Sequence, residues 1–263
     1  MSEYETSLGT SDADSITLMG LDVADDLMGK VGFGELAFWM VAQRRPSAGE
    51  VRLFEAVLVS LADHGFTPTA IAARLTYYSA PDSIQGAVAA GLLGGGSRFL
   101  GVTEDTGTFL HRIVERLGDT STWTDEEWDD TARSVLTEVK GSGKFVPGLG
   151  HPVHKSGDPR VPAMIRIATE EGVRGPHMRL FEAFGRVHPE ILGRTLPLNG
   201  AGIAGAALAD LRLPVSMLRG FSLLARTAGL VGQIAEEQRS PIGPDVYHSV
   251  DRNARFVAPR ADL

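Results

Sequence analysis

The stretch GLGHPVHKSGDPR, residues 148–160, is the most informative part of this 263-residue sequence. Its glycines and prolines predict a loop, because glycine permits left-handed backbone angles and proline interrupts helices. His151 lies inside this loop, where its ring can face a cleft, and Lys155 and Arg160 add positive charge beside it. The pattern favours an anionic ligand. A loop histidine by itself is more often a solvated surface side chain.

Outside this loop the sequence has mostly helical periodicity. Ser47 and Glu50 have the spacing of a capping box, and an apolar stripe follows that Gly65 can terminate, which places His64 at a helix end. A histidine there can also simply bond the last carbonyls of the helix. Other helical signals are Thr124 with Glu127 before 125–140, the pattern from Pro214 to Glu237, and the small-residue segments 86–96 and 200–211; the best strand signal is the short alternation at 15–19.

Breaks in the helical pattern indicate two domains. Glycine- and proline-rich tracts occur at 91–101 and 141–160, and a weaker break surrounds Pro197 and Asn199. The segment between the first and the third break is richer in charge than its flanks. We therefore predict an all-α fold with a large helical domain from 1–100 and 198–263 and a smaller inserted domain from 101–197.

Composition excludes several classes of protein. The net charge of −8 opposes binding to a nucleic-acid backbone, and the lack of cysteine removes disulfides and thiolate chemistry. No stretch approaches the roughly 18 apolar residues of a membrane span, and the acidic opening does not resemble a secretory signal. We expect a cytoplasmic protein without a membrane partner. We also predict no metal, because His111, His177, His188 and His248 lack the spacing of metal ligands.

The loop GLGHPVHKSGDPR resembles the histidine loop of the citrate synthase family, in which G-x-G-H is followed by D-P-R. The resemblance spans roughly residues 15–257 and is most detailed toward citryl-CoA lyase and the C-terminal module of ATP citrate lyase, which share the ADHG motif and a GLL-x-x-G-x-x-F tract. Three more segments follow in the family's order: LADHGFTPT with His64, LPLNGAGIAGAAL with Asn199, and LLARTAGLVGQIAEEQR with Arg226.

The resemblance implies a homodimeric, all-helical enzyme that makes or breaks a carbon–carbon bond beside a coenzyme A (CoA) thioester. It implies that His151 acts as acid/base on the substrate hydroxyl and that His64 supports the substrate or its enolate. Arg160 and Arg226 would bind substrate carboxylates, with Arg239 as a weaker candidate and Phe99 lining the cleft. CoA would lie along the histidine loop, at Lys144, Val146, Gly148, Leu149, Gly150, His154 and Lys155.

Two positions depart from the family pattern. Phe99 stands where citrate synthases have a second catalytic histidine, and the lyase relatives also have phenylalanine there. Asn199 stands where the resemblance places a catalytic aspartate, and an amide cannot shuttle a proton; Glu104 or Asp105 are candidate replacements.

We therefore expect a lyase that cleaves citryl-CoA, or a related 3-hydroxyacyl-CoA, to acetyl-CoA or another acyl-CoA and an oxo acid such as oxaloacetate. The alternatives are a citrate synthase, which Phe99 disfavours, and a catalytically weak acyl-CoA-binding regulatory paralogue, which Asn199 favours.

Overall fold

A computed structural model describes residues 4–151, 154 and 157–258. The strands are β1 (Gly9–Ser11), β2 (Ile16–Leu18) and β3 (Leu21–Asp22), and the short helices are η1 (Val23–Leu27) and η2 (Val215–Met217). The α-helices are α1 (Phe33–Ala42), α2 (Ala48–Leu61), α3 (Pro68–Ser79), α4 (Ile84–Leu93), α5 (Val102–Val114), α6 (Asp125–Gly141), α7 (Arg160–Glu170), α8 (Pro176–Leu192), α9 (Gly200–Asp210), α10 (Leu218–Arg239) and α11 (Gly243–Asp251).

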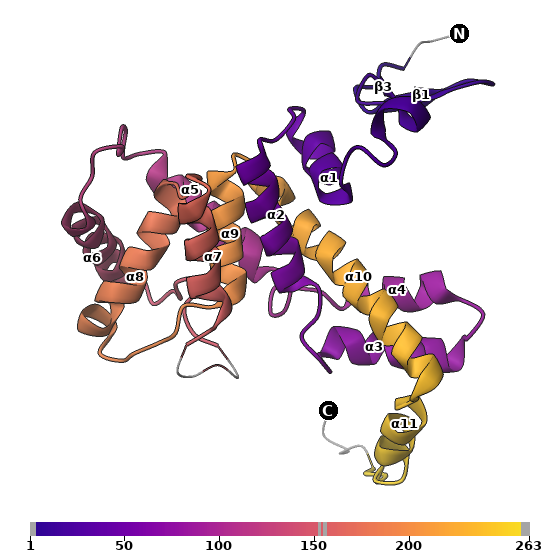
Figure 1. Ribbon diagram of the computed structural model, residues 1–263. Coiled ribbons are helices and arrows are strands. Elements are labelled where there is room, and N and C mark those ends of the chain that lie inside the picture. Colours follow the sequence, from indigo (N-terminus) through magenta and orange to yellow (C-terminus); the bar gives the residue numbers. More distant parts are fainter. Residues whose placement is uncertain (1–3, 152–153, 155–156, 259–263) are drawn as a thin grey trace. The chain divides into compact units, whose positions relative to one another are not determined.

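The predicted all-α fold is confirmed (Figure 1). The three short strands form one antiparallel sheet in the order β1-β2-β3, and β2 lies where the sequence alternation predicted a strand. Among the described residues, no helix is both long enough and apolar enough to pass through a bilayer.

Local caps start the helices where the sequence predicts. The backbone N–H of Glu50 donates to Ser47 Oγ at 3.3 Å, and the Glu50 carboxylate accepts from the Ser47 backbone N–H at 2.8 Å. Thr124 and Glu127 form the same reciprocal pair before α6. The end of α2 was predicted too late: α2 stops at Leu61, and His64 lies in the loop that follows it.

The described residues group into two compact units. Unit 1 comprises those up to Leu61 together with Gly101–Ser222, and unit 2 comprises Ala62–Leu100 together with those from Leu223 onward. This grouping cuts the chain differently from the proposed insertion of 101–197 into 1–100 and 198–263, which stays a prediction.

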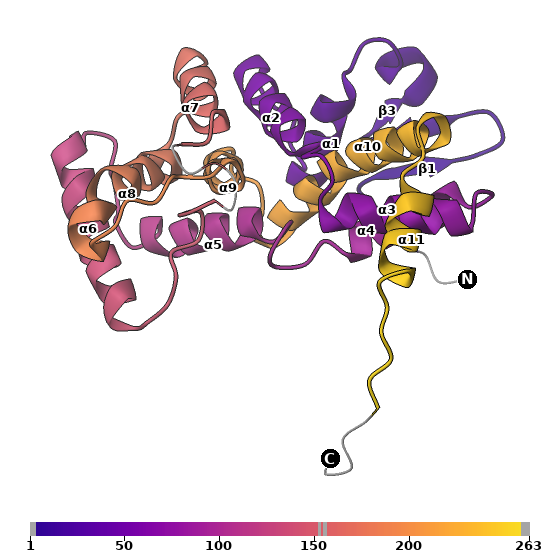
Figure 2. The ribbon, with the colours of Figure 1, turned by 90° about the horizontal axis from the view of Figure 1, so that it is seen from below.

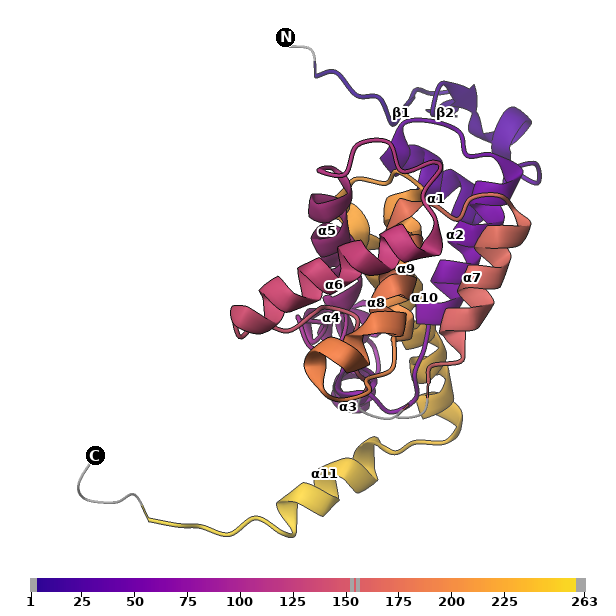
Figure 3. The ribbon, with the colours of Figure 1, turned by 90° about the vertical axis from the view of Figure 1, so that its left-hand side faces the viewer.

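Unit 1 is built around the small-residue helix α9. This helix contacts α2, α5, α7 and α8, and α6 packs on the far side of α8 (Figures 1 and 3). A Cβ on Gly205 would lie 2.2 Å from the carbonyl oxygen of Thr103, so the backbones of α9 and α5 approach more closely than any larger residue allows. The small residues of 200–211 therefore serve close helix packing.

Unit 2 packs α3 and α4 against the C-terminal part of α10 (Figure 2). Its core contains Ala73, Ala87, Leu230 and Ile234, and a Cβ on Gly91 would lie 2.7 Å from the Leu230 side chain. The first glycine of the tract at 91–101 therefore allows close helix packing.

A buried arginine on α3, which no sequence motif indicates, joins the parts of unit 2. Arg74 donates to Gln233 Oε1 at 2.7 Å and to Glu237 Oε2 at 3.0 Å, and it also pairs with Glu236. Its partners lie about 160 positions further along the chain, so no local residue spacing predicts these contacts.

Candidate active site

The histidine loop comprises residues 142–159 between α6 and α7, and its described part has four glycines with positive φ angles, at positions 143, 148, 150 and 157. Gly148 and Gly150 have φ angles of +85° and +90°, which side-chain-bearing residues rarely adopt. At Gly148 a Cβ would also lie 2.6 Å from the Phe181 ring and 3.1 Å from the Gly202 Cα. The loop backbone therefore lies directly against α8 and the first turn of α9.

Asn199 ties this loop to the N-terminus of α9. Its Nδ2 donates to the Gly150 carbonyl at 2.8 Å, its Oδ1 accepts from the Gly202 N–H at 2.8 Å, and its backbone N–H donates to the Gly148 carbonyl at 2.9 Å. The residue is buried. Both polar atoms of the Asn199 amide therefore bond to backbone groups. The bond from Nδ2 holds Gly150, the residue that immediately precedes His151.

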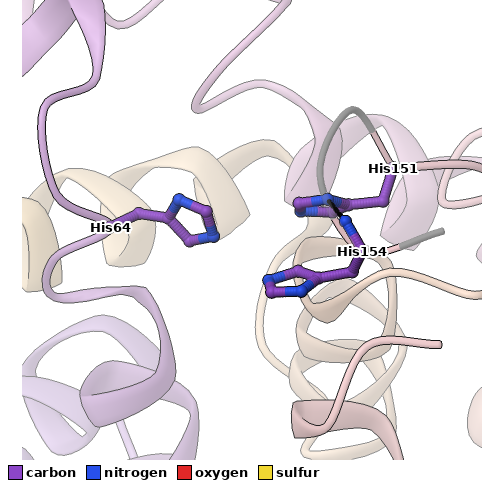
Figure 4. Close-up of side chains that lie close together, drawn as sticks. All are labelled: His64, His151 and His154. Atoms are coloured by element: carbon purple, nitrogen blue, oxygen red, sulfur yellow. Dashed lines mark hydrogen bonds between the residues drawn. The ribbon is translucent and has the colours of Figure 1, made fainter. Parts of the chain in front are cut away.

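His151 receives a hydrogen bond from its own loop. The backbone N–H of His154 donates to His151 Nδ1 at 2.9 Å, and the two ring centres are 4.4 Å apart (Figure 4). A nitrogen that accepts a hydrogen bond from an amide cannot also hold a proton, so the neutral ring carries its proton on Nε2. His151 is thereby prepared to donate from Nε2.

Arg160 begins α7 and is held by Asp158. Its Nε and Nη2 donate to the Asp158 carboxylate at 3.0 and 2.7 Å, and its Nη1 donates to the Ser60 carbonyl at 3.0 Å. The same carboxylate accepts from the Gly200 N–H at 2.7 Å. The buried Asp158 thus joins the histidine loop, α7 and the start of α9.

The electrostatics of Asp158 follow from these contacts. Burial by itself would raise the pKa of this carboxyl, but the hydrogen bonds from Arg160 and from the Gly200 N–H outweigh burial and lower the pKa to about 2. The carboxylate is therefore charged over the whole physiological range.

The lowered pKa predicts a dependence of stability on pH. Since the pKa is depressed from 3.8 to about 2 in the folded chain, the stabilisation by Asp158 is complete above pH 4 and is lost as the pH falls toward 2. The unchanged chain should have a larger free energy of unfolding than Asp158→Asn at pH 6. This difference between the two proteins should shrink by about 1.5 kcal/mol when the pH is lowered to 2.5. Urea unfolding at both pH values measures this difference; a gap that stays constant contradicts the assignment.

Four other predicted site residues lie in unit 2. His64 is exposed in the loop after α2, and Figure 4 also draws it. Arg226 on α10 is only 6% exposed and donates from Nη1 to Thr67 Oγ1 at 3.5 Å. Phe99 is 46% exposed, and Arg239 is exposed at the end of α10. That the arginines share one crevice with His151 stays a prediction.

The remaining predicted residues lie in unit 1 or outside the described residues. Lys144 is exposed, Val146 is buried and Leu149 forms a backbone bridge with Leu198. Glu104 pairs with Arg219 at 2.6 Å and Asp105 is exposed on the same turn of α5. Lys155 lies outside the described residues.

The family model described as the citrate synthase C-terminal domain matches residues 20–243 of this chain. The chain belongs to the citrate synthase family. The structure of citryl-CoA lyase from Hydrogenobacter thermophilus superimposes with a TM-score of 0.82 and 27% identity, over 99% of this chain and 97% of that one. The similarity to ATP citrate lyase from Methanothrix soehngenii, solved with citrate and coenzyme A, has a TM-score of 0.79 at 22% identity and covers all of this chain but 43% of that one.

Curated members of the citrate synthase family match over a shorter share of their own length. The 2-methylcitrate synthase 1 of Corynebacterium glutamicum is 27% identical over 227 residues, which are 81% of this chain and 53% of that protein. The chain spans about half the length of the curated synthases it matches. Family membership and the resemblance to the lyase branch are thus confirmed, while the reaction is not fixed by these similarities.

Proposed function

We propose that the chain is a carbon–carbon lyase that cleaves citryl-CoA, or a related 3-hydroxyacyl-CoA, to an acyl-CoA such as acetyl-CoA and an oxo acid such as oxaloacetate. One observation carries this choice. The citryl-CoA lyase of Hydrogenobacter thermophilus superimposes on this chain with a TM-score of 0.82 at 27% identity, whereas the citrate synthase of Thermotoga maritima superimposes with a TM-score of 0.65 at 18% identity. A thioester of CoA is then the substrate, and no step requires a metal.

Because Nδ1 accepts a hydrogen bond within the loop, we assign His151 the role of a hydrogen-bond donor to the substrate rather than that of a general base. When the carbon–carbon bond breaks, the substrate hydroxyl gives its proton to a water molecule and its oxygen becomes the carbonyl oxygen of the oxo acid. The thioester enolate that leaves takes up a proton from water on its carbon and becomes the acyl-CoA. A neutral imidazole that presents Nε2–H stabilises the negative charge on this oxygen before the bond breaks. His64 would support the enolate oxygen of the departing thioester, with Phe99 on the wall of the cleft.

Arginines would bind the acidic end of the substrate. The contacts to Asp158 and Ser60 use three of the five N–H donors of Arg160 among the described residues, so two can meet a substrate carboxylate. Arg226 supplies a second, more deeply buried guanidinium, and Arg239 would reach the site of a second copy in the homodimer that we expect.

CoA would lie along the histidine loop. Exposed Lys144 and the ring of His154 suit the adenine and phosphates, and Lys155 would add a further cation. The tight backbone of Gly148 and Gly150 allows a thioester to approach loop amides closely. We place this reaction in the cytoplasm, without nucleic-acid or membrane partners.

Two other functions each have one observation in their favour. The identity with 2-methylcitrate synthase 1 favours the condensing direction, in which an acyl-CoA and an oxo acid are joined. Asn199 favours a catalytically weak acyl-CoA-binding regulatory paralogue, because its amide is bound to backbone at both ends and moves no proton.

Incubation of the purified protein with citryl-CoA separates the three functions. Release of acetyl-CoA and oxaloacetate, followed by oxaloacetate-dependent oxidation of NADH with malate dehydrogenase, supports the lyase. Formation of citrate with free CoA from acetyl-CoA and oxaloacetate, in the absence of cleavage, points to the synthase. Tight binding of CoA with neither reaction points to the binding protein, and either of the last two outcomes overturns the proposal.

The Asn199→Asp variant should cleave citryl-CoA more slowly than the unchanged chain. An aspartate keeps the acceptor for Gly202 but turns a second oxygen toward the Gly150 carbonyl, which leaves that partly buried acceptor without its donor. Such a loss costs about 1–2 kcal/mol, which lowers the population of the competent loop by about 5- to 30-fold. Steady-state turnover with citryl-CoA measures the effect.

A matched control variant places a carboxylate at the same end of α9 and leaves the hydrogen bonds of Asn199 to Gly150 and Gly202 intact. Ala201 is half-buried between the buried Gly200 and Gly202, and Ala201→Asp leaves Asn199 in place. If turnover falls in Asn199→Asp but not in Ala201→Asp, the amide at 199 positions the loop. A rise in Asn199→Asp would instead mean that the asparagine is a catalytic lesion.

A further inference from the structure

Two histidines outside the candidate site lie next to each other in unit 1. His111 is on the last turn of α5 and His177 is on the first turn of α8. His111 Nδ1 is 3.4 Å from His177 Nε2, while the ring centres are 5.6 Å apart. The ring planes differ by 20°, and the two nitrogens are 2.2 Å closer together than the ring centres, so the rings approach each other through these nitrogens.

A carboxylate contacts the far nitrogen of each ring. His177 Nδ1 is 2.7 Å from Asp210 Oδ1, and His111 Nε2 is 3.2 Å from Glu115 Oε1. A carboxylate accepts, so each far nitrogen carries the proton of its neutral ring. The two nitrogens that face each other are then both unprotonated, and their lone pairs repel unless a cation lies beside them.

The geometry fits a metal ion better than a shared proton. A separation of 3.4 Å is long for a hydrogen bond between nitrogens. Two imidazole nitrogens on a tetrahedral Zn²⁺, each at 2.0–2.1 Å, are separated by about 3.3–3.4 Å. A carboxylate on the second nitrogen of a ligating histidine is also the arrangement that orients metal-binding imidazoles.

The pair is rigid on one side and open on the other. Asp210 is fully buried and also accepts from the backbone N–H groups of Gly175, His177 and Met178, at 3.0, 2.9 and 3.0 Å, so it holds His177 in place. The side chain of His111 is 36% exposed, which allows its ring to adjust and water to complete the coordination.

We infer that His111 and His177 form a binding site for a divalent transition-metal ion with a preference for imidazole, of which Zn²⁺ is the representative. This site is independent of the proposed lyase reaction, and it departs from the sequence-based expectation of no metal. No local motif indicates the site, because the two histidines are 66 positions apart in the chain.

Calorimetric titration of the full, chelator-treated chain with Zn²⁺ tests the site. The unchanged chain should bind one Zn²⁺ more than His111→Ala, and His248→Ala on α11, a histidine outside the pair, should bind as the unchanged chain does. Glu115→Gln should keep the site with about tenfold weaker affinity, because the neutral amide no longer supports the basicity of His111. Anomalous scattering at the zinc edge from soaked crystals should place an ion between the two named nitrogens.

Equal Zn²⁺ stoichiometry and affinity in the unchanged chain and His111→Ala would overturn the inference and leave the pair as a proton-sharing contact. The variant His111→Gln, with circular dichroism of both variants, separates lost binding from lost folding: loss in both folded variants supports the site. Citryl-CoA cleavage without added Zn²⁺ should be the same in His111→Ala and the unchanged chain, so failure of the lyase proposal does not affect this test.

Discussion

The His151→Ala variant should cleave citryl-CoA about 10²- to 10³-fold more slowly than the unchanged chain, which is the usual cost of removing one donor from a developing oxyanion. The geometry that leads to this value is the N–H of His154 on Nδ1, which leaves the ring proton on Nε2. KM should change much less than kcat, because the donor acts mainly on charge that grows as the bond breaks. Stopped-flow or coupled assays of acetyl-CoA release measure both constants.

The control for this variant is His248→Ala, which removes an imidazole from α11 and should leave kcat within twofold. Thermal unfolding of both variants shows whether the fold survives, since the loop is held chiefly by Asn199 and Asp158 rather than by His151. A folded His151→Ala protein with undiminished turnover would remove His151 from the reaction.

The Asp158→Asn variant should be less stable than the unchanged chain by about 3–4 kcal/mol at pH 7. The side chain of Asp158 is 0% exposed and accepts from two N–H groups of the Arg160 guanidinium and from the Gly200 N–H, and the neutral amide cannot satisfy all of them. The partly exposed guanidinium can regain some hydration, which keeps the cost below that of a fully buried broken pair. Urea unfolding at pH 7 gives this difference, and Tm should fall by roughly 6–12 °C.

An exposed ion pair on α6 provides the comparison. Asp130→Asn removes the 2.8 Å contact to Arg133, in which both side chains are well exposed, and should cost less than 1 kcal/mol. If Asp158→Asn destabilises the chain no more than Asp130→Asn, the Asp158–Arg160 pair does not hold the loop, α7 and α9 together.

The sequence predicts features that depend on neighbouring residues. Ser47 with Glu50 and Thr124 with Glu127 start their helices as expected, because a capping box is complete within four residues. Gly65 predicts a helix that continues up to that residue, but α2 stops at Leu61. Helix ends are weakly specified locally, since several orphan carbonyls can be satisfied in different ways.

The candidate site was only partly visible in the sequence. The histidine loop and its family resemblance identified His151, but Asn199 was interpreted as a catalytic position and Arg160 as a substrate ligand. The structure gives both of them backbone or carboxylate partners in neighbouring segments. Asp158 connects three elements through contacts that its place in the motif does not predict.

The sequence by itself determined the helical class, the helix starts, the small-residue packing of α9 and the family, because each of these follows from short-range periodicity or from a contiguous motif. Only the tertiary structure decided which nitrogen of His151 accepts a hydrogen bond from its own loop, what Asn199 binds, and that His111 lies beside His177. Those properties depend on hydrogen bonds between side chains and backbone groups that folding aligns, and an error of one ångström in such an alignment makes or breaks the bond.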